Sequence, residues 1–394
     1  MTPGLWPAIQ LSMAVAISNG IARFAYGLVL PAMREDLQWT YATAGLLNTV
    51  NAVGYMLGAL AGYAGLRTVS PARAFRIGTV IVVGSLLATP VLKDFWHLAV
   101  MRSLTGFGSA WMFSCGAALV SKIYANHARI RGTATGLYFA GAGIGMILSG
   151  AFVPRWLEQM GSTAWVSTWY AIGVASALLA VLPLRVAASL KHDASLSPAA
   201  GDKPIPIAPY LPCLSAYLLF GAGNNVYLTF LAAWINERGE GWQAVTLAWC
   251  VLGFGICLSP LIWARALNTW PATRTLATCL LTTAVGVSIS FLGSGGLPTL
   301  TSALLYGLSL FIAPTSVTLL ARSTRPASEW ASYVALFTLM FSVGQSVGPW
   351  AAGVIADHIN LTAGMAFSVA IILLGAALAN APSEAKTWAY RSGH

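Results

Sequence analysis

The sequence predicts an all-α integral membrane protein with twelve transmembrane helices, arranged as two pseudo-symmetric six-helix bundles. Composition is the first reason: 57% of the 394 residues are hydrophobic and only 8% are charged, whereas a soluble domain carries about 25% charged residues. The second reason is that the apolar residues form twelve runs, each long enough to cross a hydrocarbon core of about 30 Å. These runs cover residues 6–33, 41–64, 73–92, 95–120, 132–154, 164–184, 210–235, 243–264, 273–293, 298–321, 330–355 and 362–380.

An internal repeat is the third reason, and it divides the chain near its midpoint. Residues 185–208 form the only long polar stretch, which is rich in Pro, Ala and Ser and predicts a flexible linker. The expected units are therefore an N-terminal bundle (1–184), the linker (185–208) and a C-terminal bundle (209–394). Most of the two halves align at an offset of 201 residues, and the fifth and eleventh runs align at 203. The aligned pairs include Gly20 with Gly221, Tyr26 with Tyr227, Gly106 with Gly307 and Gly145 with Gly348.

The distribution of basic residues indicates the orientation in the membrane. Fifteen Lys and Arg residues lie on one side of the predicted spans, and four lie on the other: Arg34, Lys93, Arg155 and Arg238. Because loops rich in Lys and Arg stay in the cytoplasm, both termini and the linker are expected there. The net charge of +10 is then an orientation signal. The expected partner of the surface is a lipid bilayer, and nucleic acid is not expected.

Three short motifs resemble those of a known superfamily. The loop after the second run reads GALAGYAGLR, the fourth run contains RSLTGFG, and the fifth contains GAGIGMILSG. These strings resemble the loop signature and the helix motifs of the major facilitator superfamily, with Gly58, Gly65 and Arg67 in matching loop positions. Gly62 stands where that signature has an acid, so the usual salt bridge of this loop is not expected. The string GIARFAYG in the first run is similar to a largely uncharacterised bacterial branch.

The resemblance implies a function and a location. It implies a monomeric transporter of the bacterial plasma (inner) membrane, in which two bundles give alternating access to a central substrate site. An enzyme is not expected, because the sequence shows no nucleophile constellation, metal-ligand cluster or pair of catalytic acids. No cofactor and no metal are expected either, since the five cysteines show no ligand spacing.

Small residues in the fifth and eleventh runs predict close packing between helices. A spacing of four residues places Gly141 and Gly145 on one helix face, and Gly344 and Gly348 on another, so that backbones can approach closely. Pro349 can bend its helix where neighbours satisfy the freed carbonyl group. These two helices are expected to form the surfaces on which the bundles move against each other.

Two arginines are expected within the membrane. Arg23 lies 11 residues before Arg34, which places it roughly 16 Å deep at 1.5 Å per residue, near the middle of the hydrocarbon core. Arg102 lies eight residues after Asp94, which is about 12 Å deep by the same measure. An arginine at that depth costs roughly 2.5–3.5 kcal/mol, and every acid of the chain maps to a loop or a helix end. Arg23 is therefore expected to line a substrate cavity, and Arg102 either lines it too or is held by backbone carbonyls and polar groups of the first helix.

Other polar residues follow the same helix faces. Each is expected to line the cavity, with bridging between helices as the alternative for each one. They are Asn19 and Tyr26 in the first run, Asn48 and Asn51 in the second, Asn224, Asn225 and Tyr227 in the seventh, and Gln345 in the eleventh. Under the 201 offset, Asn224 takes the place of Arg23, so one half presents a cation and the other presents neutral amides.

These residues predict the class of substrate. An embedded cation without a fixed acidic partner favours a small organic anion, most simply a carboxylate, that binds to the guanidinium group. The alternative is an efflux pump for amphiphilic drugs or metabolites. The sequence shows no titratable acid or histidine at depth, which favours exchange, facilitated diffusion or symport in which the substrate carboxylate takes part in protonation. Asp36 and Asp94, near the outer mouth, are the alternative proton sites.

Overall fold

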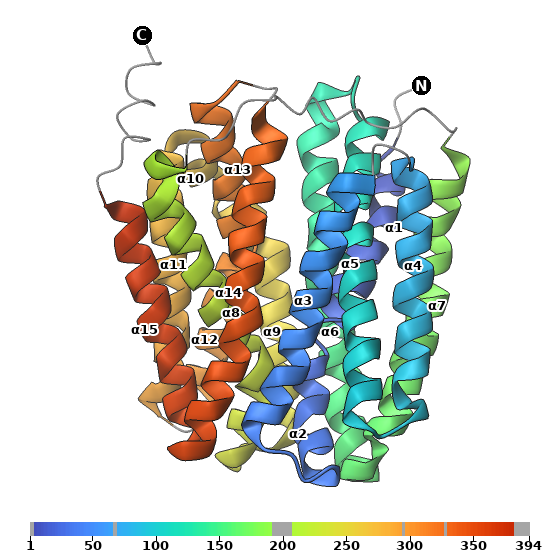
Figure 1. The fold of residues 1–394 in the computed structure, drawn as a ribbon, viewed down its shortest axis with the longest axis vertical. Coiled ribbons are helices and arrows are strands. Elements are labelled where there is room, and N and C mark those ends of the chain that lie inside the picture. Colours follow the sequence, from blue (N-terminus) through green and yellow to red (C-terminus); the bar gives the residue numbers. More distant parts are fainter. Residues whose placement is uncertain (1–3, 66–68, 191–206, 294–295, 327–328, 382–394) are drawn as a thin grey trace.

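A computed structural model shows an all-helical protein, and it describes residues 4–65, 69–190, 207–293, 296–326 and 329–381. Within these ranges, twelve helical stretches are long and apolar enough to cross a membrane, which confirms the predicted number of spans. The helices run roughly parallel to one another, and α1 begins at the same end of the molecule at which α15 ends (Figure 1). We call this the terminal end, and the other the opposite end.

The first half of the chain contributes six spans. They are α1 (Trp6–Val15) with the π-helix η1 (Ala16–Ile21) and α2 (Tyr26–Asp36); α3 (Tyr41–Gly65); α4 (Pro71–Ala88) with η2 (Thr89–Val91); α5 (Phe95–Ile123); α6 (Ala128–Met160); and η3 (Ser162–Ala164) with α7 (Trp165–Ser189). Helix α7 continues into the range 185–208 that was expected as a linker. Residues 191–206 of that range lie outside the described residues.

The second half contributes six more spans. They are η4 (Ala208–Tyr210) with α8 (Leu211–Glu237); α9 (Gly241–Ile262) with the short α10 (Ala264–Thr269); α11 (Ala272–Ile289) with η5 (Ser290–Leu292); α12 (Gly296–Ser309) with α13 (Ile312–Thr324); α14 (Trp330–His358); and α15 (Leu361–Asn380). Several helices extend beyond the apolar runs, because a helix can continue past the hydrocarbon layer while its backbone remains hydrogen-bonded.

The repeat is visible in the packing of equivalent helices. A Cβ atom placed on Gly106 of α5 would overlap the carbonyl oxygen of Asn51 in α3, and one placed on Gly307 of α12 would overlap that of Leu252 in α9. Both pairs are related by 201 residues. These glycines therefore permit the same close helix approach in each half.

Four glycines of α6 and α14 pack each half internally. Gly141 and Gly145 contact the backbone of α1 and η1 at Ser12 and Ala16, and Gly344 and Gly348 contact the backbone of α8 at Leu218 and Ala222. The two helices themselves also contact the other half, α6 against α9 and α14 against α3. The glycine pairs are also not strict repeat equivalents, because Ser12 and Leu218 are separated by 206 residues whereas Gly141 and Gly344 are separated by 203.

Other small residues bring the two halves into contact. Gly143 of α6 packs directly against the backbone of Gly253 in α9, and Gly45 of α3 packs against the carbonyl group of Pro349 in α14. Pro349 thus lies between the halves. Further toward the opposite end, Gly353 of α14 meets the backbone of Tyr41 in α3.

The residues of the loop signature are only partly described. Gly58 packs against the backbone of Phe107 in α5, and its carbonyl oxygen accepts a hydrogen bond of 2.8 Å from Trp111 Nε1, so it fastens α3 to α5. Gly65 is the last residue of α3. Arg67 lies outside the described residues.

Candidate functional site

The first span is interrupted in the middle of the molecule. In η1 the backbone N–H of Ala22 donates to Ile17 O at 2.7 Å and that of Phe24 donates to Asn19 O at 2.9 Å, which are bonds five residues apart. Residues 22–25 then form a turn before α2 begins at Tyr26. Non-helical backbone at membrane depth occurs where protein or a cavity surrounds it, and π-bulges are frequent at functional sites.

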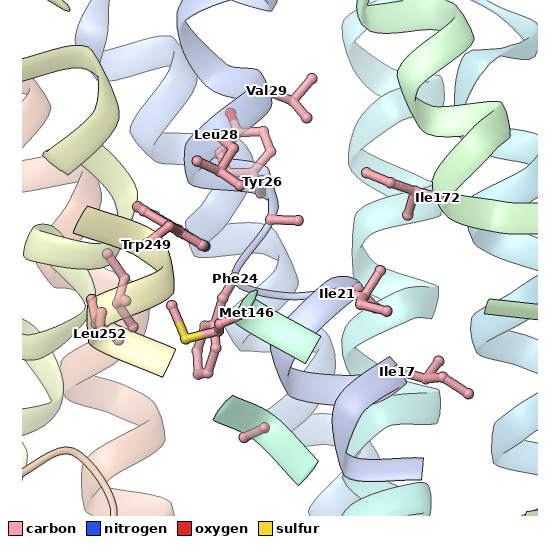
Figure 2. Close-up of a cluster of buried hydrophobic side chains, with 14 of the residues drawn as sticks. Ile17, Ile21, Phe24, Tyr26, Leu28, Val29, Met146, Ile172, Trp249 and Leu252 are labelled. Carbon is pink, nitrogen blue, oxygen red and sulfur yellow. The ribbon is translucent and has the colours of Figure 1, made fainter. Parts of the chain in front are cut away.

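Hydrophobic side chains enclose this interruption. Figure 2 shows Phe24 on the connection before α2, close to Met146 of α6, with Trp249 and Leu252 of α9 on the neighbouring side. All four side chains are buried. The turn at residues 22–25 is therefore shielded by helices from both halves.

Arg102 supports the interrupted backbone. Its Nη1 donates to the carbonyl oxygen of Ala22 at 2.7 Å and its Nη2 to Asn48 Oδ1 at 3.4 Å, while its guanidinium group lies 4.7 Å from the ring centre of Tyr26. The side chain is 1% exposed. Of the two roles left open for Arg102, these contacts match the structural one, in which it is held by a backbone carbonyl and by polar groups nearby.

Arg23 lies in the turn itself, and its described hydrogen-bond and ring contacts are with neutral groups. Its Nη2 donates to Gln345 Oε1 in α14, and its guanidinium carbon lies 5.0 Å from the ring centre of Tyr55 and 5.7 Å from that of Phe24. Its Nε is buried without a partner. Among the described residues, no Asp or Glu lies within ion-pair distance of Arg23.

The amides of the first half surround Arg102 more than Arg23. Asn51 Nδ2 donates to the carbonyl oxygen of Arg102 at 2.8 Å, while its own Oδ1 is buried without a partner. Asn48 Nδ2 donates to Thr229 Oγ1 at 2.6 Å and so joins the two halves. Asn19 lies in η1 and bonds locally, donating from Nδ2 to Ser18 Oγ at 3.1 Å.

Tyr26 serves the packing of α2 against α3. Its hydroxyl group donates to the carbonyl oxygen of Ala44 at 2.8 Å, and its ring lies under Arg102. Tyr26 thus reaches Arg102 rather than Arg23, although sequence spacing puts both Arg23 and Tyr26 on one predicted helix face. The turn between them breaks that periodicity.

The polar residues of α8 divide between two groups. Asn225 Nδ2 donates to the carbonyl oxygen of Gln345 at 3.3 Å, which places Asn225 beside the Arg23 contact. Asn224 instead accepts from Tyr306 OH, with its carbonyl oxygen 2.6 Å away. The ring of Tyr306 stacks on Tyr227 with centres 4.3 Å apart, and Tyr227 OH is 2.7 Å from Ser302 Oγ.

Thr229, Ser302 and Tyr306 were not anticipated from the sequence. Thr229 follows Asn225 by one helical turn, so the stripe of polar positions in the seventh run could have indicated it. Tyr306 directly precedes Gly307, the repeat partner of Gly106. A search for polar residues beside repeat-related glycines would have found it.

The candidate site is closed around its residues in this conformation. Arg23 is 8% exposed and Gln345 is fully buried. A pocket of about 340 Å³ lies between the halves at the opposite end and is lined by residues that include Glu35, Glu158 and Trp242. Another, of about 560 Å³, lies at the terminal end beside α10. Neither is lined by Arg23.

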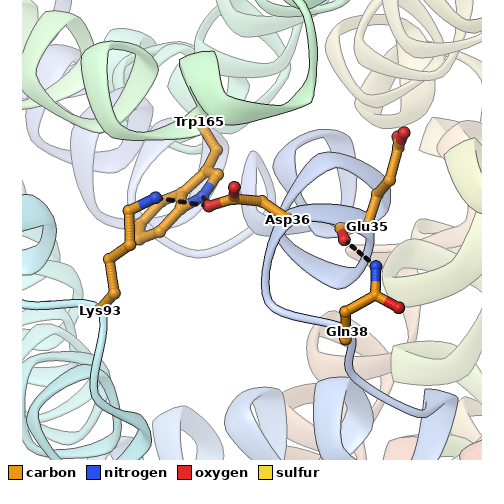
Figure 3. Close-up of polar contacts among 5 residues, drawn as sticks. All are labelled: Glu35, Asp36, Gln38, Lys93 and Trp165. Carbon is orange, nitrogen blue, oxygen red and sulfur yellow. Dashed lines mark hydrogen bonds and ion pairs between the residues drawn. The ribbon is translucent and has the colours of Figure 1, made fainter.

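The two outer acids named as alternative proton sites both have structural partners. Figure 3 shows Lys93 and Trp165 converging on Asp36; Lys93 Nζ and Trp165 Nε1 lie 2.7 and 2.8 Å from its Oδ2. Asp94 caps the N-terminus of α5, where its Oδ2 accepts from the backbone N–H of His97 at 3.0 Å. Among the residues that the structure describes, no group of three or more His, Cys, Asp or Glu side chains could hold a metal ion.

Comparison with known proteins places the chain in a family. Residues 13–381 match the family described as "Uncharacterised MFS-type transporter YbfB". Among solved structures, the chain is similar to the nucleoside transporter NupG (TM-score 0.73, 12% identity, 95% of this chain and 98% of that one). It is also similar to a bacterial homologue of the human lysosomal transporter Spinster, in an inward-facing and occupied conformation (TM-score 0.70, 14% identity, 97% and 96%). At these identities the likeness shows the fold.

Two curated proteins match shorter segments. One is the chloroplastic sodium-dependent phosphate transport protein 1 of Arabidopsis thaliana, 25% identical over 173 residues, which are 43% of this chain and 33% of that protein. The other is the Protein spinster of Drosophila melanogaster, 29% identical over 147 residues, which are 36% and 24%. The chain thus matches a third or less of the length of these relatives. The family match, which covers most of the chain, identifies it as a member of the MFS-type transporter YbfB family.

Proposed function

We propose that this protein moves a small organic anion, with a carboxylate as the simplest candidate, across the membrane by alternating access. Membership in an MFS-type transporter family supports transmembrane transport. The observation that carries the choice of substrate is the environment of Arg23. Its guanidinium group is buried among an amide and two aromatic rings, with one N–H unpaired.

The energetics of Arg23 favour an anionic ligand. A buried charge without an ion-pair partner is costly, and an unpaired buried donor adds about 1–3 kcal/mol. A bound carboxylate would offset both costs through charge-assisted hydrogen bonds. Arg102 differs from Arg23 in its acceptors: a backbone carbonyl and an amide oxygen accept from its Nη1 and Nη2, although its Nε is also buried without a partner. Arg23 is therefore the principal anion ligand in this proposal, and Arg102 holds the interrupted first span in place.

The contacts between the halves support an inward-facing state. Three glycines pack against the backbone of the other half: Gly45 against Pro349, Gly27 against Leu228, and Gly353 against Tyr41. Tyr41 OH also donates to Glu237 of α8. If the positive loops lie in the cytoplasm, as proposed, the terminal end faces inward and these contacts close the outer side. We further propose that the protein is a monomer of the bacterial inner membrane with both termini in the cytoplasm.

A thermal-stability screen of the purified protein in detergent tests the choice of substrate. Ligands that bind the folded state raise the melting temperature with concentration. We expect at least one organic carboxylate to do so in the wild type, and no carboxylate to do so in Arg23→Ala. Arg274→Ala is the matched control, because Arg274 lies at the start of α11 and contacts Trp270. A wild type that responds to no carboxylate, or an Arg23→Ala variant that responds fully, contradicts the proposal.

The same variants separate the proposal from drug efflux. An efflux pump for amphiphilic compounds would be stabilised by neutral or cationic apolar ligands, and Arg23→Ala would leave that response intact. Loss of a carboxylate response in Arg23→Ala, without a response to amphiphilic cations in either protein, favours anion transport.

A further inference from the structure

We propose that Arg23 and Gln345 form a carboxylate subsite in which the amide of Gln345 stands in for the substrate until an anion replaces it. This inference rests on the proposed function and extends it. It states how the anion is held, and it names the residue of the second half that recognises it.

The first part of the argument is the geometry of the Arg23 donors. Nη2 donates to Gln345 Oε1, whereas Nε is buried without a partner. These two nitrogen atoms belong to the same edge of the guanidinium group, and such an edge matches the two oxygen atoms of one carboxylate. The single amide oxygen of Gln345 therefore fills half of a two-donor site.

The second part is the state of Gln345. Its side chain is fully buried, and its Nε2 is also without a partner. The backbone of Gln345 is held by Asn225, whose Nδ2 donates to its carbonyl oxygen at 3.3 Å. Two unpaired buried donors, one from each half of the protein, thus flank the same contact.

One carboxylate would satisfy both donors. It has two oxygen atoms with about four acceptor positions, enough for Arg23 Nε, Arg23 Nη2 and Gln345 Nε2 once the amide moves aside. A primary amide ligand offers one oxygen and turns its own N–H groups toward those of Arg23. The site should therefore distinguish a carboxylate from its uncharged amide analogue, because only the carboxylate leaves no buried donor unpaired.

The position of Arg23 and Gln345 means that replacing the Gln345 amide with an anion affects transport. Arg23 belongs to the first span and Gln345 to α14, so their hydrogen bond links the two halves at the interruption of the first span. An anion that takes the place of Gln345 replaces a direct link with a bridged one. Anion binding at this subsite therefore changes a contact between the two halves, which move relative to each other during alternating access.

Three variants test this inference in the thermal-stability assay, with formate, acetate, lactate and succinate as probes and their amides as controls. Gln345→Glu supplies the carboxylate internally. We expect it to melt at a higher temperature than the wild type without ligand, and to lose the response to every probe. Arg23→Gln should also lose the response. The double variant Arg23→Gln with Gln345→Arg should regain at least part of it, because the subsite again has one guanidinium and one amide.

The matched control is Gln159→Glu, which makes the same chemical change at an exposed position near the end of α6. It should keep the wild-type response. If the wild type responds and Arg23→Gln does not, but Gln345→Glu keeps the full response, the subsite is wrong and the proposed function stands. If no carboxylate stabilises the wild type, both fail together. Should Gln345→Glu not fold, the double variant decides: no recovery over Arg23→Gln overturns the subsite.

Discussion

Asp357 of α14 accepts hydrogen bonds from the backbone at the beginning of α3: its Oδ1 lies 2.7 Å from Tyr41 N, and its Oδ2 lies 2.8 Å from Ala42 N. The first N–H groups of a helix have no partner within the helix and carry partial positive charge, so a carboxylate there forms charge-assisted bonds. Because α3 and α14 belong to different halves, this single carboxylate fastens the two halves at the opposite end.

Replacing Asp357 by Asn should weaken the closure of the opposite end. The amide keeps one acceptor and loses the charge, which corresponds to a loss of about 0.5–2 kcal/mol for a cap at a helix N-terminus. We expect the distance between spin labels at Glu35 and Ile359, both exposed, to shift toward longer values in pulsed electron paramagnetic resonance.

Asp94→Asn is the matched control for this measurement. Asp94 also caps a helix N-terminus, but α5 and its cap belong to the same half. The control should lower stability by a similar amount and leave the label distance unchanged. An unchanged distance distribution in Asp357→Asn would show that this contact does not hold the closed state.

Arg102→Met should destabilise the protein more than Arg23→Met. The first change leaves the carbonyl oxygen of Ala22 and the Oδ1 of Asn48 without this donor, at about 1–3 kcal/mol for each buried group left unpaired. The second removes a buried cation whose acceptor is one neutral amide. Melting temperatures without ligand check the order, and a greater loss in Arg23→Met would contradict the separate roles given to the two arginines.

Gly45→Ala should open the opposite end without unfolding either half. The added Cβ would overlap the carbonyl oxygen of Pro349 in the other half, so the two halves must separate there. The spin-label distance between Glu35 and Ile359 should lengthen. Gly84→Ala is the control, because nothing lies within 4 Å of its Cβ position in α4, and helix propensity alone predicts a gain of about 1 kcal/mol or less.

The hydrogen bond between Asn48 and Thr229 should contribute a measurable coupling between the halves. Their side chains are buried and lie 2.6 Å apart from Nδ2 to Oγ1. A double-mutant cycle with Asn48→Ala and Thr229→Val removes the separate effect that Asn48 has on Arg102. We expect a coupling of about 0.5–1.5 kcal/mol, typical of a buried hydrogen bond; a value near zero would mean that the bond does not join the halves energetically.

Much of the fold could be predicted because the bilayer imposes its own constraints. A span needs an apolar run of about 20 residues, so the twelve spans could be read from composition along the chain. The repeat could be read too, since Gly106 and Gly307 recur at a fixed distance and meet equivalent backbone. Helix ends were less predictable, as α7 shows by continuing to Ser189, because a helix does not stop where the apolar residues stop.

The partners of the polar residues could not be predicted in the same way. The prediction that Asn19, Arg23 and Tyr26 share one face required an uninterrupted helix. The π-helix and the turn after it break that helix, so that Arg23 contacts Gln345 and Tyr26 contacts Arg102. Among the glycines of α6 and α14, Gly141 and Gly344 pack within a half, whereas Gly143 and Gly353 contact the other half. Periodicity gives the face of a regular helix, and it does not say which neighbour that face meets.

The sequence by itself determined that this protein is a twelve-span membrane protein with a repeat, and it predicted two arginines at membrane depth without an acid nearby in the chain. Only the tertiary structure decided that Arg102 holds the backbone of Ala22 while Arg23 contacts the side chain of Gln345 from the other half. The physical reason is that the depth of an arginine, and the free energy that its burial costs, follow from the residues along its own helix. The satisfaction of a buried donor depends on atoms supplied by helices far apart in the chain.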